Sequence, residues 1–312
     1  MTLANIRFPE DNPFSRIKLR HIFGWFFLLT MGISFQIGII ASTRGIKFDS
    51  KTPFDPLVGP IFGTYLTILV LALVWRECRL AGIEIKYLVG KVPDRYQWLP
   101  LVGLAIASLF FSLGVFRIFY YPLSFIVPSF VEKLLIDRNS SILIRPAATL
   151  FPALYYLISA IYYAILPLIF TFIFQAILLH RWAAKWGKTR AIIAFILLSL
   201  ISYNFISSVI ATSINAILYV KTRSLLVLII FVYLKILISV IWNLSYKTFL
   251  DNQAGSTLDV FRSQVQLGVL FFVVSAPWVI GFIYKNWSVL KGPLPYFANA
   301  SEAEKIKADS ET

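Results

Sequence analysis

Residues 170–204 read FTFIFQAILLHRWAAKWGKTRAIIAFILLSLISYN, and this stretch decides the fold. It begins inside an apolar run at residues 147–180, passes through a basic turn at residues 181–190, and ends inside a second apolar run at residues 191–220. A helix needs roughly 20 apolar residues to cross the hydrocarbon core of a bilayer. The stretch is therefore predicted to join two membrane helices through a short basic loop.

The composition of the whole chain also indicates a membrane protein. Hydrophobic residues make up 58% of the 312 residues, charged residues make up 14%, and the mean hydropathy is +0.77. The net charge of +14 comes from Lys and Arg in short loops between apolar runs, the distribution typical of cytoplasmic membrane loops. We therefore expect a lipid bilayer and no nucleic acid as partner. The predicted fold class is an all-α, polytopic transmembrane helix bundle.

About eight spans are predicted, and the run at residues 191–220 decides their number. As one helix this run would be about 45 Å long, whereas a turn near residues 204–208 would divide it into two helices. Division places most of the Lys and Arg residues on the side of the N-terminus, as the positive-inside rule requires. Both termini are therefore expected to be cytoplasmic. The membrane is expected to be a bacterial inner or plasma membrane, or a thylakoid. The other spans are predicted at residues 22–42, 59–75, 99–120, 147–180, 225–244 and 265–284.

Three regions follow from this reading of the chain. Residues 1–146 form an N-terminal membrane region with three spans, residues 147–285 form the core helices, and residues 286–312 form a polar cytoplasmic tail. The last residues of the tail, SEAEKIKADSET, are expected to be disordered because they are polar and highly charged. Residues 76–98 are expected to form an interfacial helix followed by a proline turn, and residues 130–137 a short surface helix.

Two segments of the core carry a resemblance to a known family. In FIFQAILLHRWAAKWG, Phe174 and Gly187 stand in a layout of an apolar helix with a basic end, and YVKTRSLLV forms a basic turn before the next apolar run. These segments resemble the CPBP family, also called Abi, which includes CAAX prenyl endopeptidases and bacteriocin-processing proteins. The resemblance covers about residues 167–244. It implies that these helices form a CPBP-like core, similar in fold to an intramembrane metalloprotease.

The residues that carry catalysis in that family are replaced here. The family signature is Glu-Glu-x-x-x-Arg on one helix, Phe-x-x-x-His on the next, and His-x-x-x-Asn or His-x-x-x-Asp on a later one. The replaced positions are Phe170 and Thr171 for the glutamates, Gln175 for the arginine, Asn204 for the second-motif histidine, and Val232 and Ile236 for the third motif. We therefore identify no confident catalytic residue.

Lys235 is the first ligand-binding candidate. It lies at the centre of its predicted span, where a lysine costs about 2.5 to 3.5 kcal/mol on insertion scales. Together with Asn204, Gln175 and Thr171 it is expected to line the former cavity, as a structural lock or as a contact for an anionic lipid headgroup. A tilted helix that brings Lys235 near a membrane surface is the simpler alternative.

Neither a metal nor another cofactor is expected. Zinc needs three or four His, Cys, Asp or Glu ligands. The predicted spans contain no acidic residue, His21 and His180 lie at span ends, and Cys78 is the single cysteine, which also leaves no internal disulfide. The first apolar run is long and has no small-residue cleavage site, so it is expected to stay as a span.

The predicted function is that of a pseudoenzyme: a CPBP-like membrane protein, catalytically inactive, that binds lipid or a membrane protein partner. Two alternatives remain open. The first is an active CPBP-family endopeptidase, in which Thr171 or Ser202 would act as nucleophile with Lys235 as base. The second is a small-solute transporter, which the lack of acidic residues in the spans disfavours, because ion coupling usually requires one.

Overall fold

The computed structural model describes residues 12–43, 58–139, 152–201, 205–250 and 257–311. Throughout these ranges the regular structure is helical, with no strand, so the predicted all-α class is confirmed. The helices group into two compact units, Met1–Glu84 with Ser140–Ile173 and Ile85–Asn139 with Phe174–Thr312. The three-region division at residues 146 and 285 stays a prediction.

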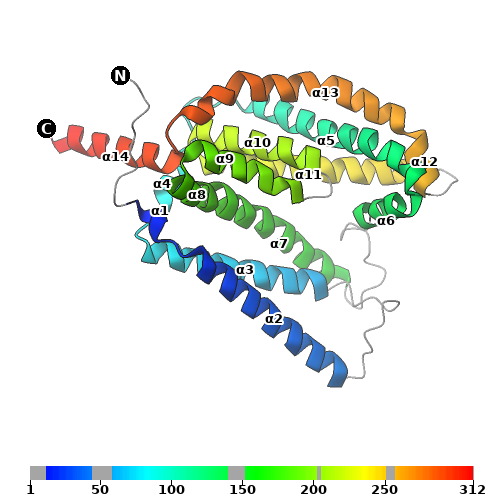
Figure 1. Ribbon diagram of the computed structural model, residues 1–312, viewed down its shortest axis with the longest axis horizontal. Coiled ribbons are helices and arrows are strands. Elements are labelled where there is room, and N and C mark those ends of the chain that lie inside the picture. Colours follow the sequence, from blue (N-terminus) through cyan, green and yellow to red (C-terminus); the bar gives the residue numbers. More distant parts are fainter. Residues whose placement is uncertain (1–11, 44–57, 140–151, 202–204, 251–256, 312) are drawn as a thin grey trace. The chain divides into compact units, whose positions relative to one another are not determined.

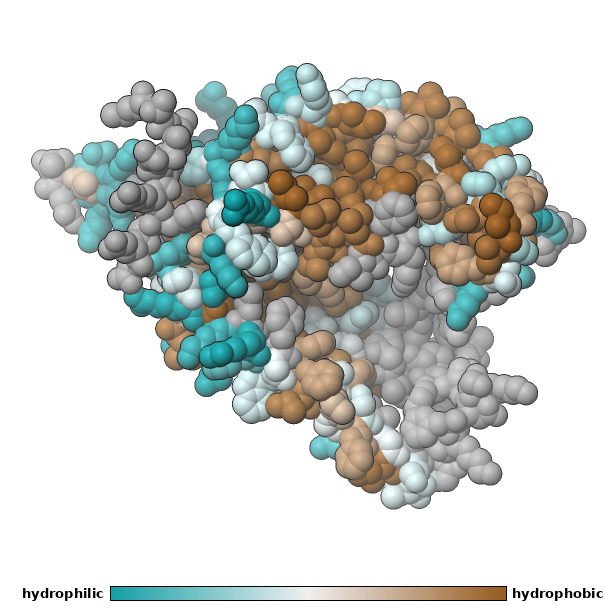
Figure 2. Space-filling view, viewed as in Figure 1, coloured by the Kyte–Doolittle hydropathy of each residue, from teal (hydrophilic) through white to brown (hydrophobic). Residues whose placement is uncertain are grey.

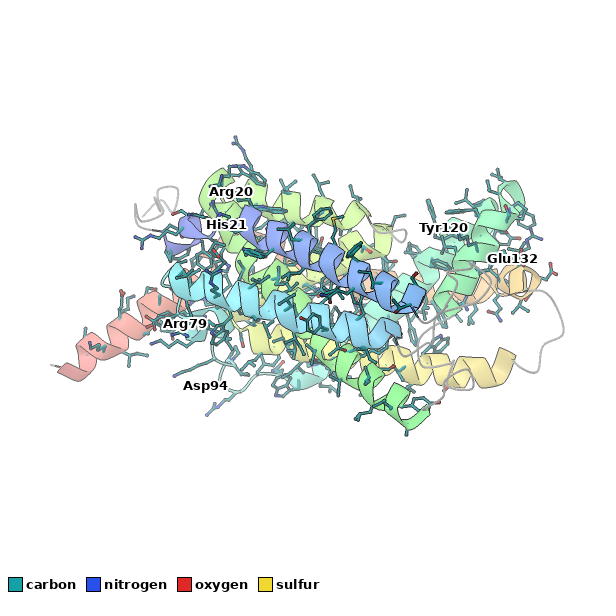
Figure 3. The ribbon with its side chains drawn as sticks, turned by 90° about the horizontal axis from the view of Figure 1, so that it is seen from below. Arg20, His21, Arg79, Asp94, Tyr120 and Glu132 are labelled. Carbon is teal, nitrogen blue, oxygen red and sulfur yellow. The ribbon has the colours of Figure 1, made fainter. Side chains whose placement is uncertain are left out.

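The first unit contains a packed set of long helices. Its described helices are α1 (Pro13–Arg16), α2 (Leu19–Thr43), α3 (Val58–Leu80) and α7 (Pro152–Phe170). α3 packs against both α2 and α7. Gly63 permits close packing with α7, since a Cβ atom there would lie 2.5 Å from the Tyr162 ring. Figure 3 shows Arg20 and His21 at the beginning of α2 and Arg79 at the end of α3, so the basic ends of this antiparallel pair coincide.

The second unit is built around one long helix, α5. Its elements are α4 (Ile85–Val89), α5 (Trp98–Ile126), α6 (Pro128–Asn139), α8 (Leu179–Trp186), α9 (Lys188–Leu198), η5 (Ser199–Ile201), α10 (Phe205–Thr222), α11 (Leu225–Leu250), α12 (Thr257–Ser263), α13 (Val265–Asn286), η6 (Trp287–Lys291) and α14 (Pro295–Glu311). α5 packs against α10, α11 and α13, and it lies beside α13 in Figure 1. The predicted surface helix at residues 130–137 lies within α6.

Glycine and aromatic residues hold α5, α11 and α13 together. A Cβ atom on Gly114 of α5 would lie 2.6 Å from the backbone nitrogen of Phe272, so the two backbones approach closely there. Beside this crossing, the Phe110 and Phe271 rings stack with centroids 4.8 Å apart, and Trp242 of α11 meets Phe271 edge-on. Small residues at helix crossings are typical of membrane bundles, in which van der Waals contact drives association.

In the described part of the chain, five helices are long and apolar enough to cross a membrane. They cover Ile61–Leu80, Trp98–Ile126, Tyr156–Trp186, Leu225–Trp242 and Val265–Lys291. Figure 2 shows apolar side chains gathered on the surface over α5 and α13, as expected for helices that face lipid. The chain is therefore described as a multi-pass membrane protein. The count of eight spans stays a prediction.

The run at residues 191–220 forms two helices, as predicted. α9 ends at Leu198, η5 follows, and α10 begins at Phe205 and packs against α9. α9 has only 11 residues, fewer than a membrane-spanning helix needs. Asn204, where the sequence placed both the turn and a site residue, lies outside the described residues.

Two local predictions are wrong. The tail that was expected to be disordered belongs to the helix α14, whose first turns are anchored to the second unit through Asn299. The expected interfacial helix at residues 76–98 is largely absent. Residues 76–80 extend α3, and α4 covers five residues, Ile85–Val89, before an irregular segment that leads to α5.

Candidate functional site

The positions that the CPBP resemblance assigns to the first motif, Phe170, Thr171 and Gln175, lie where the helical geometry changes. α7 contains Pro167 and ends at Phe170, and the next eight residues form a π-helix, η4 (Thr171–Leu178). Proline has no N–H to donate, so the α-helical hydrogen-bond ladder cannot continue unchanged through Pro167. π-helical turns are rare in proteins, and those that occur often lie at functional sites. Phe170 is exposed, whereas Thr171 and Gln175 are buried.

Gln175 carries an unsatisfied polar atom. Its side chain is only 4% exposed, and in the described part of the chain its Oε1 atom has no hydrogen-bond partner. A buried acceptor without a partner costs about 1 to 3 kcal/mol. Native proteins leave few buried polar atoms in this state, so the Oε1 atom of Gln175 is a candidate for contact with a ligand.

Lys235 lies in α11, within the most apolar of the five candidate spans. Its Nζ atom is 5.6 Å from the centroid of the buried Phe231 ring, within the range of a cation–π contact. Among the described residues it forms no hydrogen bond or ion pair. Val232 and Ile236, the third-motif positions on the same helix, are partly buried.

Of the predicted site residues, Thr171 and Gln175 lie on one element, η4, where their spacing of four residues in the chain already places them about one turn apart. Within the described ranges no hydrogen bond joins Gln175 to Lys235. The cavity of four residues, which also needs Asn204, therefore stays a prediction.

His180, which the sequence places at a span end, lies near the end of the candidate span Tyr156–Trp186 and is enclosed by protein. It is fully buried, its Nδ1 atom faces the backbone oxygen of Ala176, and its Nε2 atom accepts a hydrogen bond of 3.3 Å from the backbone nitrogen of Tyr296. Accepting at Nε2 requires the tautomer that carries its proton on Nδ1. Both ring nitrogens are thus engaged, so this histidine fixes α14 and is not available as a base or a metal ligand.

A buried arginine in α5 was not among the predicted site residues. Arg117 of α5 is 7% exposed, and its Nη2 atom donates a hydrogen bond of 3.1 Å to Oε1 of Gln264, the residue before α13. Gly268 makes room for it, because a Cβ atom there would lie 2.5 Å from the Arg117 Cβ. Its place inside an apolar run is the one signal that the sequence carries for this residue, but its burial does not follow from that place. Buried charges in apolar spans are generally functional or structural pairs.

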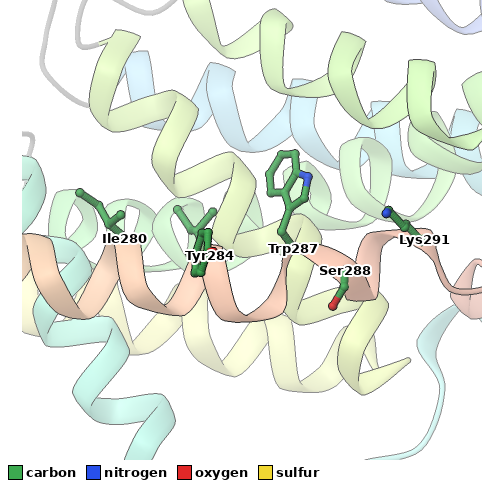
Figure 4. A pocket seen from close by; sticks show the side chains of 6 residues that line it. Ile280, Tyr284, Trp287, Ser288 and Lys291 are labelled. Atoms are coloured by element: carbon green, nitrogen blue, oxygen red, sulfur yellow. The ribbon is translucent and has the colours of Figure 1, made fainter.

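A surface groove at the end of α13 was also missed. Its volume is about 450 Å³, and Figure 4 shows Ile280, Tyr284, Trp287, Ser288 and Lys291 in order along α13 and η6. Its lining is apolar towards the middle of α13 and polar at the other end. The i, i+4, i+7, i+8, i+11 spacing of these residues is a helical stripe that the sequence already contained.

Lysines fix the segment that forms this groove. Lys188, at the beginning of α9, donates hydrogen bonds to the backbone oxygens of Lys291 and Gly292. Partial burial lowers the pKa of Lys188, because its ammonium group loses water there. Lys221, at the end of α10, donates a hydrogen bond of 2.8 Å to Oδ1 of Asn286. The groove is therefore held by cations bound to neutral acceptors.

Within the described ranges, no three His, Cys, Asp or Glu side chains lie close enough together to hold a metal ion. Comparison of the chain with protein-family models, with curated proteins and with solved structures finds no match. The resemblance to the CPBP family accordingly stays a prediction.

Proposed function

We propose that this chain is a multi-pass membrane protein with a CPBP-like core in which the hydrolytic residues have been replaced, and that it binds lipid. The observation that carries the proposal is the chemistry of η4. At the positions of the family's glutamate and arginine, a π-helix presents the neutral, buried side chains Thr171 and Gln175. An amide cannot act as a general base near neutral pH, whereas the unsatisfied Oε1 atom of Gln175 can accept a hydrogen bond from a ligand.

Lys235 supports binding of an anionic group. Its ammonium lies in a strongly apolar span beside an aromatic ring, and among the described residues no carboxylate neutralises it. A cation in this setting gains from an anion supplied by a ligand, because water is scarce and the effective dielectric constant is low. Lipid phosphate is the anion that a membrane supplies most abundantly, and because Lys235 lies at the centre of its span, the lipid headgroup has to enter between the helices to reach it.

The first test concerns hydrolysis. Purified full-length protein is incubated with a fluorogenic peptide and with a prenylated peptide, alongside the variants Lys235→Ala and Thr171→Ala. We expect the same background rate for all three proteins. Turnover by the wild type above the rate of both variants would overturn the proposal and favour the endopeptidase.

The second test concerns lipid. A leucine at position 235 removes the insertion cost of the lysine, so in delipidated detergent Lys235→Leu should be at least as stable as the wild type. In native lipid extract the wild type should become the more stable protein, because only it gains the ligand contact. Ser239→Leu, one turn further along α11, is the matched control. Its order of thermal stability relative to the wild type should be the same in delipidated detergent and in native lipid extract. Equal thermal stability of Lys235→Leu and wild type in both media would contradict a binding role for Lys235.

A further inference from the structure

The groove on α13 and η6 changes character along its length. Ile280, Ile283 and Tyr284 line one part, while Ser288 and Lys291 line the other. From Ile280 to Trp287 the helix rises by about 10 Å, which is long enough for a stretch of acyl chain to lie along it. The groove is thus apolar along most of its length and ends at the hydroxyl of Ser288 and the ammonium of Lys291.

The polar end of the groove coincides with the end of a candidate membrane span. The span reaches Lys291, and the two aromatic residues before it are exposed, Tyr284 at 86% and Trp287 at 46%. Trp and Tyr at this position are typical of the headgroup level of a bilayer. Ser288 and Lys291 should therefore lie at the depth of lipid phosphates.

The charge around this end is positive and not compensated locally. Lys188 and Lys221 bind neutral oxygens, and Lys285 and Lys291 are exposed. In the part of the chain that the structure describes, none of these four lysines forms an ion pair. A juxtamembrane cluster of this kind attracts anionic headgroups.

We infer that this groove binds one anionic phospholipid of the surrounding leaflet. An acyl chain lies against Ile280 and Tyr284, Trp287 packs at the glycerol level, and the phosphate accepts hydrogen bonds from Lys291 and Ser288. The inference rests on the proposed lipid-binding function and gives it a site and a ligand class. It differs from that function in its location, since Lys235 and Gln175 do not line the groove.

The experiment measures lipid binding to the full-length protein in detergent by native mass spectrometry. Phosphatidylglycerol and phosphatidylcholine with identical acyl chains are titrated separately. The variants are Lys291→Gln and Ser288→Leu, with Lys285→Gln as the matched control, because Lys285 is exposed at the same helix end but does not line the groove. We expect the wild type to bind phosphatidylglycerol more tightly than phosphatidylcholine. Lys291→Gln should weaken phosphatidylglycerol binding about fivefold, and Lys285→Gln should leave it within twofold.

Several outcomes would overturn the inference. Equal affinity for the two lipids would show that the groove holds acyl chains without reading the headgroup. Equal losses in Lys291→Gln and Lys285→Gln would reduce the effect to general surface charge. A dimer that dissociates when Trp287→Ala is introduced would assign the groove to a second copy of the chain.

A failure of the proposed function would be seen separately. Hydrolysis of a peptide by the wild type would remove the pseudoenzyme proposal and leave the phosphatidylglycerol preference untouched. Conversely, the phosphatidylglycerol preference could be absent while no hydrolysis is seen and Lys235→Leu still changes its stability order between detergent and lipid extract. That result would contradict the lipid site in the groove and leave the proposed function in place.

Discussion

At the scale of single residues, close approach between backbones decides which positions tolerate change. A Cβ atom on Gly114 would lie within 3 Å of backbone atoms of Phe272 and Gly268, which cannot move like the end of a flexible side chain. Gly281, which lies in α13 like Phe272 and Gly268, has open space around its Cβ position. The two glycines therefore form a matched pair.

We expect Gly114→Ala to lower the free energy of unfolding by about 1 to 3 kcal/mol, because the added methyl group forces α5 and α13 apart. Gly281→Ala should be neutral or should stabilise by up to about 1 kcal/mol, since alanine favours a helix. Thermal unfolding in one detergent measures both. Similar midpoints for the two variants would contradict the close crossing.

A substitution at Gln175 is expected to raise the free energy of unfolding, in contrast to Gly114→Ala. Gln175→Leu removes a buried oxygen that has no partner among the described residues, so it should raise the stability of delipidated protein by about 1 kcal/mol. The exposed Gln266→Leu on α13 is the control and should stay within about 0.5 kcal/mol. Destabilisation by Gln175→Leu in delipidated detergent would show that this oxygen already has a partner in the protein.

The sequence could identify Gln175 and Thr171 as positions of interest only through the family resemblance. Their burial and the π-helix around them depend on neighbouring helices, and no local pattern predicts these. Arg117 was overlooked for a related reason. Its place three residues before the predicted end of a span resembles that of an arginine that reaches the membrane surface, whereas packing with Gln264 and Gly268 keeps it inside.

At the scale of elements, α14 shows how anchoring residues override composition. Nδ2 of Asn299 donates hydrogen bonds of 2.9 Å to the backbone oxygens of both Tyr87 and Arg223. Gly90 has no side chain to block this contact, because a Cβ atom there would meet the Arg223 oxygen. The polar sequence beyond Ser301 reads as disordered, but the residues that hold the helix precede it.

We expect Asn299→Leu to release α14 from the second unit. Loss of two hydrogen bonds costs about 2 kcal/mol, which raises the undocked population roughly thirtyfold. Limited proteolysis should then cut within residues 295–311 faster than in the wild type. Ser301→Ala is the control, because among the described residues the hydroxyl of Ser301 bonds only to Ala298 of its own helix. Equal cleavage rates for the two variants would contradict docking through Asn299.

The long apolar helices were the elements that the sequence predicted best. Runs such as residues 225–244 are apolar apart from a few positions, and length alone then indicates a helix in the absence of water. Short elements were harder. α4 and η6 owe their positions to partners distant in sequence, such as Tyr219, whose hydroxyl donates a 3.0 Å hydrogen bond to the backbone oxygen of Leu88.

At the scale of the whole molecule, the placement of charge predicts orientation. The loop before α5 and the turn between α10 and α11 are basic, and they lie at the end of the second unit opposite α12. The positive-inside rule assigns that end to the cytoplasm.

Cysteine labelling can check this orientation. In a Cys78→Ser background, single cysteines replace the exposed residues Ser263 and Lys91. On intact cells a membrane-impermeant maleimide should label the cysteine at position 263 and not the one at position 91, and after lysis it should label both. Labelling at position 91 on intact cells would invert the predicted topology.

The bridging role of Asn299 has a consequence for the order of folding. Domains form from the N-terminal side while the chain is being made. The hydrogen bonds that join the segment at Tyr87 to the turn at Arg223 use a side chain that lies 76 residues after that turn. These two segments can therefore be joined only after the helices between Arg223 and Asn299 have been made, so α14 docks after α11 and α13 have formed.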